Sequence, residues 1–285
     1  MTEPLDAADP FVDSAWLREQ LGSTGADATS PRIVLCHVGT TMGGTDPRAA
    51  FADAHIPGAR FVSLDDDLAD APGPIVGRHP LPTPEHFAAV LGSLGIEPTD
   101  HVVAVDGRGG GVAARFVWML RVIGQRASLL ADDWTGPWES SLPTADADRS
   151  GDGARSFDPV DRHPIPWPPE AIADADEVAA TVRLGGTVID SRAPERYRGE
   201  VEPLDAVAGH VPGAVNLPFD DDDPHRFDGI DTGRPTIVSC GSGVTACFNA
   251  LAMEAAGLPR PKVYVGSWSG WSTDPTRPVA TGDEG

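Results

Sequence analysis

The sequence predicts an α/β protein made of two consecutive domains, each a mainly parallel sheet with helices on both faces. Two observations lead to this prediction. Apolar runs typical of buried strands alternate with stretches typical of helices, an order that favours parallel sheets covered by helices. The chain also repeats itself: the segment 55–59 (His-Ile-Pro-Gly-Ala) recurs as 210–214 (His-Val-Pro-Gly-Ala).

The repeated motif marks matching elements in the two halves. Each half opens with a helical stretch and a buried strand, and an acidic stretch after the motif leads to a second buried strand. That strand meets a glycine-rich turn and a helix, and a short apolar run closes the half. In chain order the predicted strands are 33–35, 102–105, 128–130, 187–190, 236–239 and 263–265, and the helices after the turns are 112–124 and 244–257.

The stretch between the two halves is rich in Asp, Ser, Gly and Pro, a composition typical of a linker. We therefore expect an N-terminal domain over 1–143, a linker over 144–169 and a C-terminal domain over 170–285. Only the second domain has a cysteine where its central strand ends. The matching position in the first domain is Asp106.

Cys240 is the most informative residue for function. It follows the predicted strand 236–239 and begins a Cys-Gly-Ser-Gly turn that leads into the predicted helix. A thiol at the start of a helix lies at the positive end of the helix dipole, which favours the thiolate, and the two glycines let backbone N–H groups turn toward an anion. The pattern indicates a reactive cysteine. Cys36, in an apolar run, and Cys247, within the helix, are expected in the core.

Composition narrows the possible functions. The chain has 285 residues and a formal net charge of −22, which argues against partners such as nucleic acid and anionic membrane surfaces. It has no apolar segment long enough for a transmembrane helix, and its acidic N-terminus does not resemble a signal peptide. None of its three cysteines has CxxC spacing, so we expect neither a disulfide framework nor a zinc site. These features predict a reducing, cytoplasmic location.

The chain resembles the tandem rhodaneses, the thiosulfate/3-mercaptopyruvate sulfurtransferase family. The resemblance extends over nearly the whole length, and it implies two rhodanese-like domains of which the N-terminal one, with Asp106 in place of Cys, is inactive. It also implies that Cys240 takes a sulfane sulfur from thiosulfate or 3-mercaptopyruvate as a persulfide and passes it to cyanide or a thiol, without cofactor or metal. The motifs that carry the resemblance are the cysteine loop 240–246, the two repeated motifs, 190–192 (Asp-Ser-Arg), 196–199 (Arg-Tyr-Arg-Gly) and 266–268 (Gly-Ser-Trp).

The resemblance also implies which residues form the site. Cys240 and Ser242 are the expected catalytic residues. Three further candidates each have a structural alternative: His55 as a residue that fixes a turn, Arg192 as an ion-pair partner of Asp190, and Trp268 as a packing residue. The expected substrate-binding residues are Arg196, Gly241, Gly243, Val244, Thr245 and Ala246.

The loop also bears on the choice of sulfur donor. In the family, a Cys-Gly-Ser-Gly-Val-Thr loop resembles the 3-mercaptopyruvate type, whereas the thiosulfate type has Arg-Lys after the cysteine. Mercaptopyruvate enzymes often carry a second substrate arginine at the end of a Pro-Glu-Pro-Arg stretch, and here that position is Asp205. Another arginine, for example Arg192 or Arg198, would have to substitute. The sequence therefore leaves both donors open.

Two other classes of protein compete with this interpretation. A rhodanese-like phosphatase needs a Cys-x5-Arg loop, and Ala246 stands where that arginine would be. A non-enzymatic persulfide carrier or binding module for a protein acceptor would keep Cys240 but need no donor site, and a thioredoxin-like protein would suit it as a partner. Sulfur transfer that survives a Cys240→Ser change would contradict the enzymatic interpretation.

Overall fold

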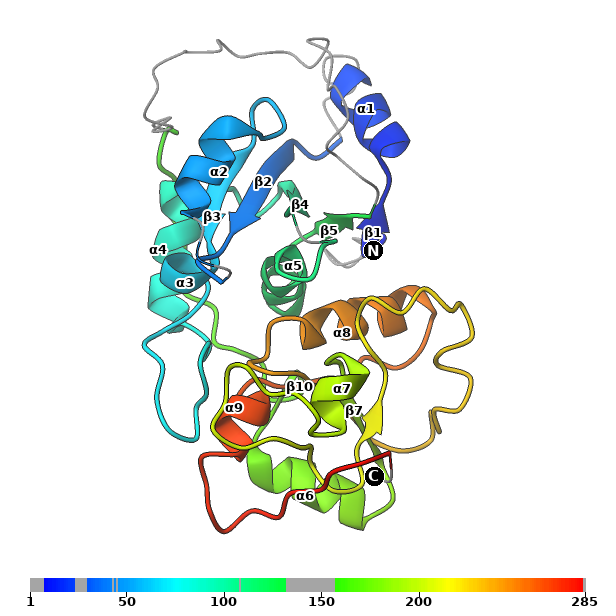
Figure 1. Cartoon of the computed structure of the whole chain (residues 1–285). Coiled ribbons are helices and arrows are strands. Elements are labelled where there is room, and N and C mark those ends of the chain that lie inside the picture. The colour runs from blue at the N-terminus through cyan, green and yellow to red at the C-terminus, as the bar shows by residue number, and fades with distance from the viewer. Residues whose placement is uncertain are drawn as a thin grey trace. The chain divides into compact units, whose positions relative to one another are not determined.

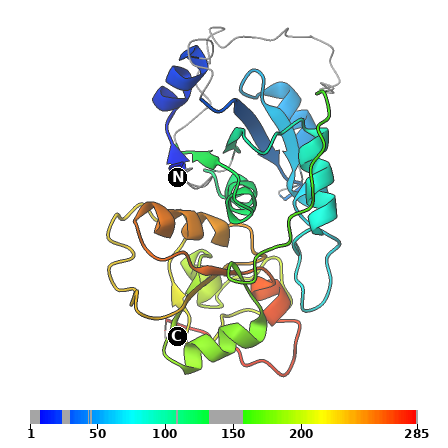
Figure 2. The same cartoon turned by 180° about the vertical axis from the view of Figure 1, so that it is seen from behind.

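Two compact units make up the protein (Figures 1 and 2). The first consists of Met1–Leu68 and Pro82–Pro166, and the second of Ala69–Leu81 and Trp167–Gly285. The expected division at 143 and 170 did not include the short excursion at 69–81, which packs with the second unit. Residues 144–156 of the expected linker lie outside the described residues. The computed structural model describes residues 8–23, 30–42, 44, 46–107, 109–131 and 157–283.

The first unit is built on a five-stranded sheet in the order β1-β5-β4-β2-β3, in which every neighbouring pair is parallel. The central strand β4 (His101–Val105) is buried along its whole length. The other strands are β1 (Phe11–Val12), β2 (Ile33–Gly39), β3 (Arg60–Ser63) and β5 (Ala127–Leu130), and the helices are α1 (Ser14–Ser23), α2 (Pro47–Asp53), α3 (Leu64–Asp67), α4 (Pro84–Ser93) and α5 (Ala113–Val122).

The second unit repeats this topology with the strand order β6-β10-β9-β7-β8, again parallel throughout. Helices α6 and α8 cover opposite faces of its sheet (Figures 1 and 2). The predicted fold class, two parallel-sheet α/β domains, is therefore confirmed. The strands are β6 (Ile172–Ala173), β7 (Thr187–Asp190), β8 (Val215–Asn216), β9 (Thr236–Ser239) and β10 (Lys262–Tyr264), and the helices are α6 (Ala175–Arg183), α7 (Pro194–Tyr197), α8 (Ala246–Ala255) and α9 (Ser267–Trp271).

The loop between β9 and α8 is longer than the sequence predicted. The helix begins at Ala246 rather than at Val244, and Thr245 is its N-cap residue. Gly243 adopts φ +75°, a left-handed conformation, so the chain turns at this residue before it enters the helix. Cys36 on β2 and Cys247 on α8 are both fully buried, as predicted.

Among the described residues, no helix has the length and apolar character that crossing a membrane requires.

The two copies of the repeated motif form the same turn. His55 Nδ1 lies 2.7 Å from the carbonyl oxygen of Phe51, and His210 Nδ1 lies 2.7 Å from that of Tyr197. Each imidazole also stacks on the ring of the same residue, with centroids 4.1 Å apart in the first pair and 3.7 Å in the second. Each histidine thus holds the chain just before its Pro-Gly turn.

Gly58 and Gly213 provide a matched pair for measuring how the repeat is packed. Both have positive φ, +84° and +82°, so alanine at either position costs about 1–2 kcal/mol. A Cβ at Gly58 meets nothing, whereas at Gly213 it overlaps Val182 on α6. We expect Gly213→Ala to lower the free energy of unfolding by about 1–3 kcal/mol more than Gly58→Ala, as overpacking does. Urea denaturation checks this, and equal losses would contradict it.

Candidate active site

The loop that carries Cys240 is attached to the start of α9. The backbone N–H of Cys240 donates to Ser267 Oγ at 3.1 Å, and its carbonyl oxygen accepts from Trp268 N at 3.0 Å. Ser269 N donates to the carbonyl oxygen of Gly241 at 2.9 Å. Ser267 is fully buried and has φ +50°, an uncommon value for a residue with a side chain. This strained residue therefore fixes the position of the cysteine backbone.

Within the loop, the Cys240 thiol has a backbone donor aimed at it. Gly243 N donates to Cys240 Sγ at 3.1 Å, and the cysteine is only 2% exposed. A Cβ at Gly243 would overlap the carbonyl oxygen of Val265, so glycine alone fits this close approach. A hydrogen bond from an N–H group stabilises a sulfur anion, whether it is the thiolate or the terminal sulfur of a persulfide.

The equivalent loop of the first unit holds a carboxylate instead. One oxygen of Asp106 accepts from Gly110 N at 2.9 Å, and the other accepts from Val112 N and Ala113 N at 2.7 Å each. The same turn thus holds an acceptor side chain at the start of the helix in both units, a carboxylate in the first and the Cys240 sulfur in the second. The carboxylate of the first unit satisfies three backbone donors.

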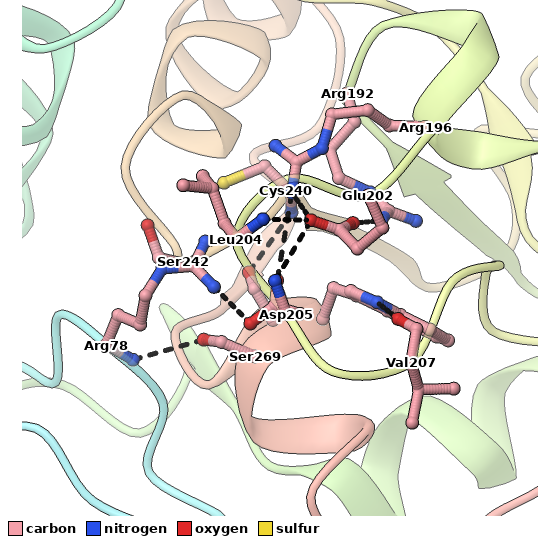
Figure 3. A network of polar contacts seen from close by, with 12 residues as sticks. Arg78, Arg192, Arg196, Glu202, Leu204, Asp205, Val207, Cys240, Ser242 and Ser269 are labelled. Atoms are coloured by element: carbon pink, nitrogen blue, oxygen red, sulfur yellow. Dashed lines mark hydrogen bonds and ion pairs between the residues drawn. The ribbon is translucent and has the colours of Figure 1, made fainter. Parts of the chain in front are cut away.

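Two guanidinium groups lie over Gly241, the residue next to the cysteine. A Cβ at Gly241 would lie 3.0 Å from Arg78 Nη2 and 3.3 Å from Arg196 Nη1. Arg196 follows β7 on α7, whereas Arg78 comes from the excursion at 69–81, where its backbone N–H donates to Ser269 Oγ at 3.1 Å. The loop itself has no cation, so these two side chains provide the positive charge beside Cys240 (Figure 3).

The side chain of Glu202 is 3% exposed and connects two arginines of the second unit. It accepts from Arg196 Nη2 at 2.7 Å and from Arg192 Nη1 at 3.2 Å, and it also accepts from the backbone N–H groups of Leu204 and Asp205. Burial opposes ionisation of this carboxyl, but the bonds from Arg196 and from the two N–H groups outweigh it and lower the pKa of Glu202. Glu202 is therefore a charged anchor for the loop that follows it.

Arg192 contacts both Glu202 and the ring of Trp268. Arg192 is 3% exposed, and its Nε and Nη2 donate hydrogen bonds to the Asp190 carboxylate at 3.0 and 2.6 Å. This is the structural ion pair that the sequence suggested as the alternative to a binding role. The Arg192 guanidinium lies 5.0 Å from the centre of the Trp268 ring, whose Nε1 donates to the Val207 carbonyl oxygen at 2.8 Å. Both side chains are occupied by packing and pairing. Arg198 pairs with Glu200 and Asp283 instead of filling the place of the missing arginine.

The histidine that contacts Ser242 is His79. Its Nδ1 lies 2.9 Å from Ser242 Oγ, and both side chains are buried. His55, the histidine that the sequence suggested, belongs to the first unit, where its ring is bonded to the Phe51 carbonyl. Sequence reasoning therefore missed both Arg78 and His79. One signal was present: the interval between the repeated motif and the central strand, β4 or β9, is much longer in the first half (60–100) than in the second (215–235).

The remaining predicted residues lie along the loop and the first turn of the helix. Val244 is buried, Thr245 precedes α8 without a side-chain cap hydrogen bond, and Ala246 is its first residue. Within the described residues, no group of His, Cys, Asp or Glu is arranged to hold a metal ion.

Known proteins resemble this chain over most of its length. Residues 174–274 match the family model of the rhodanese-like domain. The "Probable 3-mercaptopyruvate sulfurtransferase" of Pseudomonas aeruginosa is 40% identical over 253 residues, which are 82% of this chain and 86% of that protein. The 3-mercaptopyruvate sulfurtransferase of Homo sapiens is 36% identical over 247 residues, 80% of each chain.

A solved structure is similar across both units. The crystal structure of SseA from Escherichia coli, described as a 3-mercaptopyruvate sulfotransferase, superposes with a TM-score of 0.71 at 30% sequence identity. The superposition covers 92% of this chain and all of that one. The similarity thus includes the unit with Asp106 as well as the unit with Cys240.

Proposed function

Since the chain belongs to the rhodanese family of sulfurtransferases, we propose that Cys240 is the residue that carries the transferred sulfur, as a persulfide, from an anionic donor to a thiophilic acceptor. The observation that carries this proposal is the position of Cys240. Its sulfur accepts a backbone N–H bond at 3.1 Å, and the guanidinium groups of Arg78 and Arg196 lie over the next residue.

With 3-mercaptopyruvate as donor, the first step breaks a carbon–sulfur bond. The Cys240 thiolate attacks the donor sulfur, and the electron pair of the broken bond passes to the methylene carbon, leaving the enolate of pyruvate. The proton of the donor thiol then moves to that carbon, so that pyruvate leaves and a persulfide anion remains on Cys240. The hydrogen bond from Gly243 N stabilises this anion as it forms.

We assign the proton transfer in this step to Ser242 and His79. Their side chains lie 2.9 Å apart, and Ser242 is two residues from the reacting sulfur. A hydroxyl paired with an imidazole can accept one proton while delivering another, which is the requirement for moving the thiol proton to the enolate. The second step needs no proton, because cyanide attacks the outer sulfur of the persulfide anion and thiocyanate leaves with regeneration of the thiolate.

Between the two donors, we propose 3-mercaptopyruvate. Its carboxylate matches the planar fork of an arginine, and Arg196 and Arg78 present two such groups beside an uncharged Gly-Ser loop. The names of the Pseudomonas and human relatives support the same choice. Acceptors would be cyanide, a small thiol or a thioredoxin-like protein thiol. We place the reaction in the reducing cytoplasm, where Cys36, Cys240 and Cys247, which form no disulfide in the described residues, would remain reduced.

The direct test compares the two donors in steady-state sulfuration of cyanide by the purified protein. We expect a kcat/KM at least about ten-fold higher for 3-mercaptopyruvate, as an interaction of about 1.4 kcal/mol would give. A higher value for thiosulfate would contradict the donor assignment and leave the persulfide chemistry in place. Activity with neither donor, from protein whose Cys240 reacts with thiol reagents, would favour the carrier alternative.

A further inference from the structure

The carboxylate of Asp205 lies against the two guanidinium groups that face the cysteine loop. Its Oδ1 accepts a hydrogen bond from Arg78 Nη1, and its Oδ2 lies 3.7 Å from Arg196 Nη2 (Figure 3). The Asp205 side chain is 8% exposed. A carboxylate of the protein therefore contacts the same two arginines that we assign to the donor.

The charges around the loop are already balanced. Three cations, Arg78, Arg192 and Arg196, are matched by three anions, which are Asp190, Glu202 and Asp205. Glu202 makes four described bonds and cannot leave without exposing two backbone N–H groups. An anionic donor that approaches Cys240 therefore finds no surplus positive charge unless Asp205 moves away from its partners.

Asp205 is held much less firmly than Glu202. Among the described residues, Asp205 Oδ2 is buried without a hydrogen-bond donor, and so is Arg196 Nε without an acceptor. A buried polar atom without a partner is unfavourable, and a ligand that provides the partner recovers that free energy. A donor carboxylate with two oxygens could bond both arginines, whereas Asp205 bonds only one of them.

We propose that Asp205 is an exchangeable counter-ion: the carboxylate of the sulfur donor displaces it from Arg78 and Arg196, and Arg78 is the second donor-binding arginine of this chain. The inference rests on the proposed function for the identity of the anion. It explains how an acidic residue is tolerated at a position where the family resemblance predicted a cation, since the excursion at 69–81 provides the missing guanidinium from elsewhere in the sequence.

The first test measures the charge preference of Cys240 without any sulfur transfer. Two methanethiosulfonates of similar size are used, one with a 2-sulfonatoethyl and one with a 2-hydroxyethyl group. The thiolate of Cys240 displaces methanesulfinate from either reagent and forms a mixed disulfide, which peptide mass spectrometry distinguishes from products at Cys36 and Cys247. The ratio of the two second-order rates reports how well the site accepts an anion.

We expect Asp205→Asn and Arg78→Met to change this ratio in opposite directions. Asp205→Asn removes the competing carboxylate at constant shape and should raise the ratio about three-fold or more. Arg78→Met removes the cation at similar length and should lower it about ten-fold, as the loss of a charge-assisted bond does. Arg198→Met is the matched control, because Arg198 pairs with Glu200 and Asp283 and should leave the ratio unchanged.

The second test is the KM for 3-mercaptopyruvate, which should fall in Asp205→Asn and rise in Arg78→Met. If Asp205→Asn lowered the ratio of reagent rates and raised the KM for 3-mercaptopyruvate, the counter-ion proposal would be wrong. Asp205 would then position Arg78 rather than compete with the donor. An unchanged ratio in Arg78→Met would overturn the binding role of Arg78. The reagent test needs only a reactive thiol, so it stays decisive even if neither expected donor is a substrate.

Discussion

The Cys240→Ser variant is expected to lose sulfur transfer to cyanide by at least about 10³-fold with either donor, the size of loss seen when a covalent nucleophile is removed. A serine hydroxyl is not ionised near neutral pH and forms no persulfide, so the two half-reactions that share the sulfur intermediate are both lost. Steady-state thiocyanate formation measures the loss. Mass spectrometry of protein treated with donor alone should show the addition of one sulfur atom in the native chain and none in the variant.

Cys247→Ser is the control for this experiment. Cys247 lies on α8, is fully buried, and has its sulfur 3.4 Å from the Gly243 carbonyl oxygen, a bond that a serine hydroxyl can also donate. We expect it to keep most of the activity. If Cys240→Ser retained transfer while Cys247→Ser abolished it, Cys247 would be the sulfur carrier and the proposed mechanism would be wrong.

The Asp106→Ala variant is expected to lower the free energy of unfolding of the first unit by about 3 kcal/mol or more. The change leaves the N–H groups of Gly110, Val112 and Ala113 without the carboxylate that now accepts from all three, and each unpaired buried group costs about 1–3 kcal/mol. Chemical denaturation gives the loss of stability, and faster amide hydrogen exchange at these three residues identifies its source.

Asp106→Asn separates the shape of the side chain from its charge. The amide keeps one acceptor oxygen in the same place, so we expect a loss about half as large as for alanine. If the three amides exchanged hydrogen as slowly in Asp106→Ala as in the native chain, the carboxylate would not be what holds the loop. The kinetics of sulfur transfer should change little in both variants, because Cys240 belongs to the other unit.

The sequence predicted what depends on local patterns. Stretches of a few residues were enough to predict the alternation of strands and helices and the position of Cys240 at the end of β9. The ion pair of Arg192 with Asp190 was also within reach, because it joins residues only two positions apart. The start of α8 was placed two residues too early because apolar Val244 fits a helical pattern, while the constraint comes from the packing of Gly243 against Val265.

Arg78 and His79 could not be predicted because their contacts are distant in sequence. Arg78 N bonds to Ser269 Oγ across 191 positions, and Ile75 N bonds to Thr273 Oγ1 across 198. No helix or strand lies within the excursion 69–81, so its sequence has no hydrophobic periodicity that would indicate which unit it packs against. The family resemblance implied His55 instead, whose ring nitrogen is bonded to the Phe51 carbonyl oxygen.

The excursion at 69–81 also affects how the protein is made. During synthesis this segment leaves the ribosome long before the Cys240 loop and α9, which it contacts through His79 and Arg78, have been translated. Domains usually fold in order as the chain emerges, but here the second unit stays incomplete until α9 is made. A chain that began at Trp167 would lack Arg78 and His79, so the proposed sulfur-transfer site depends on a segment from the first half of the sequence.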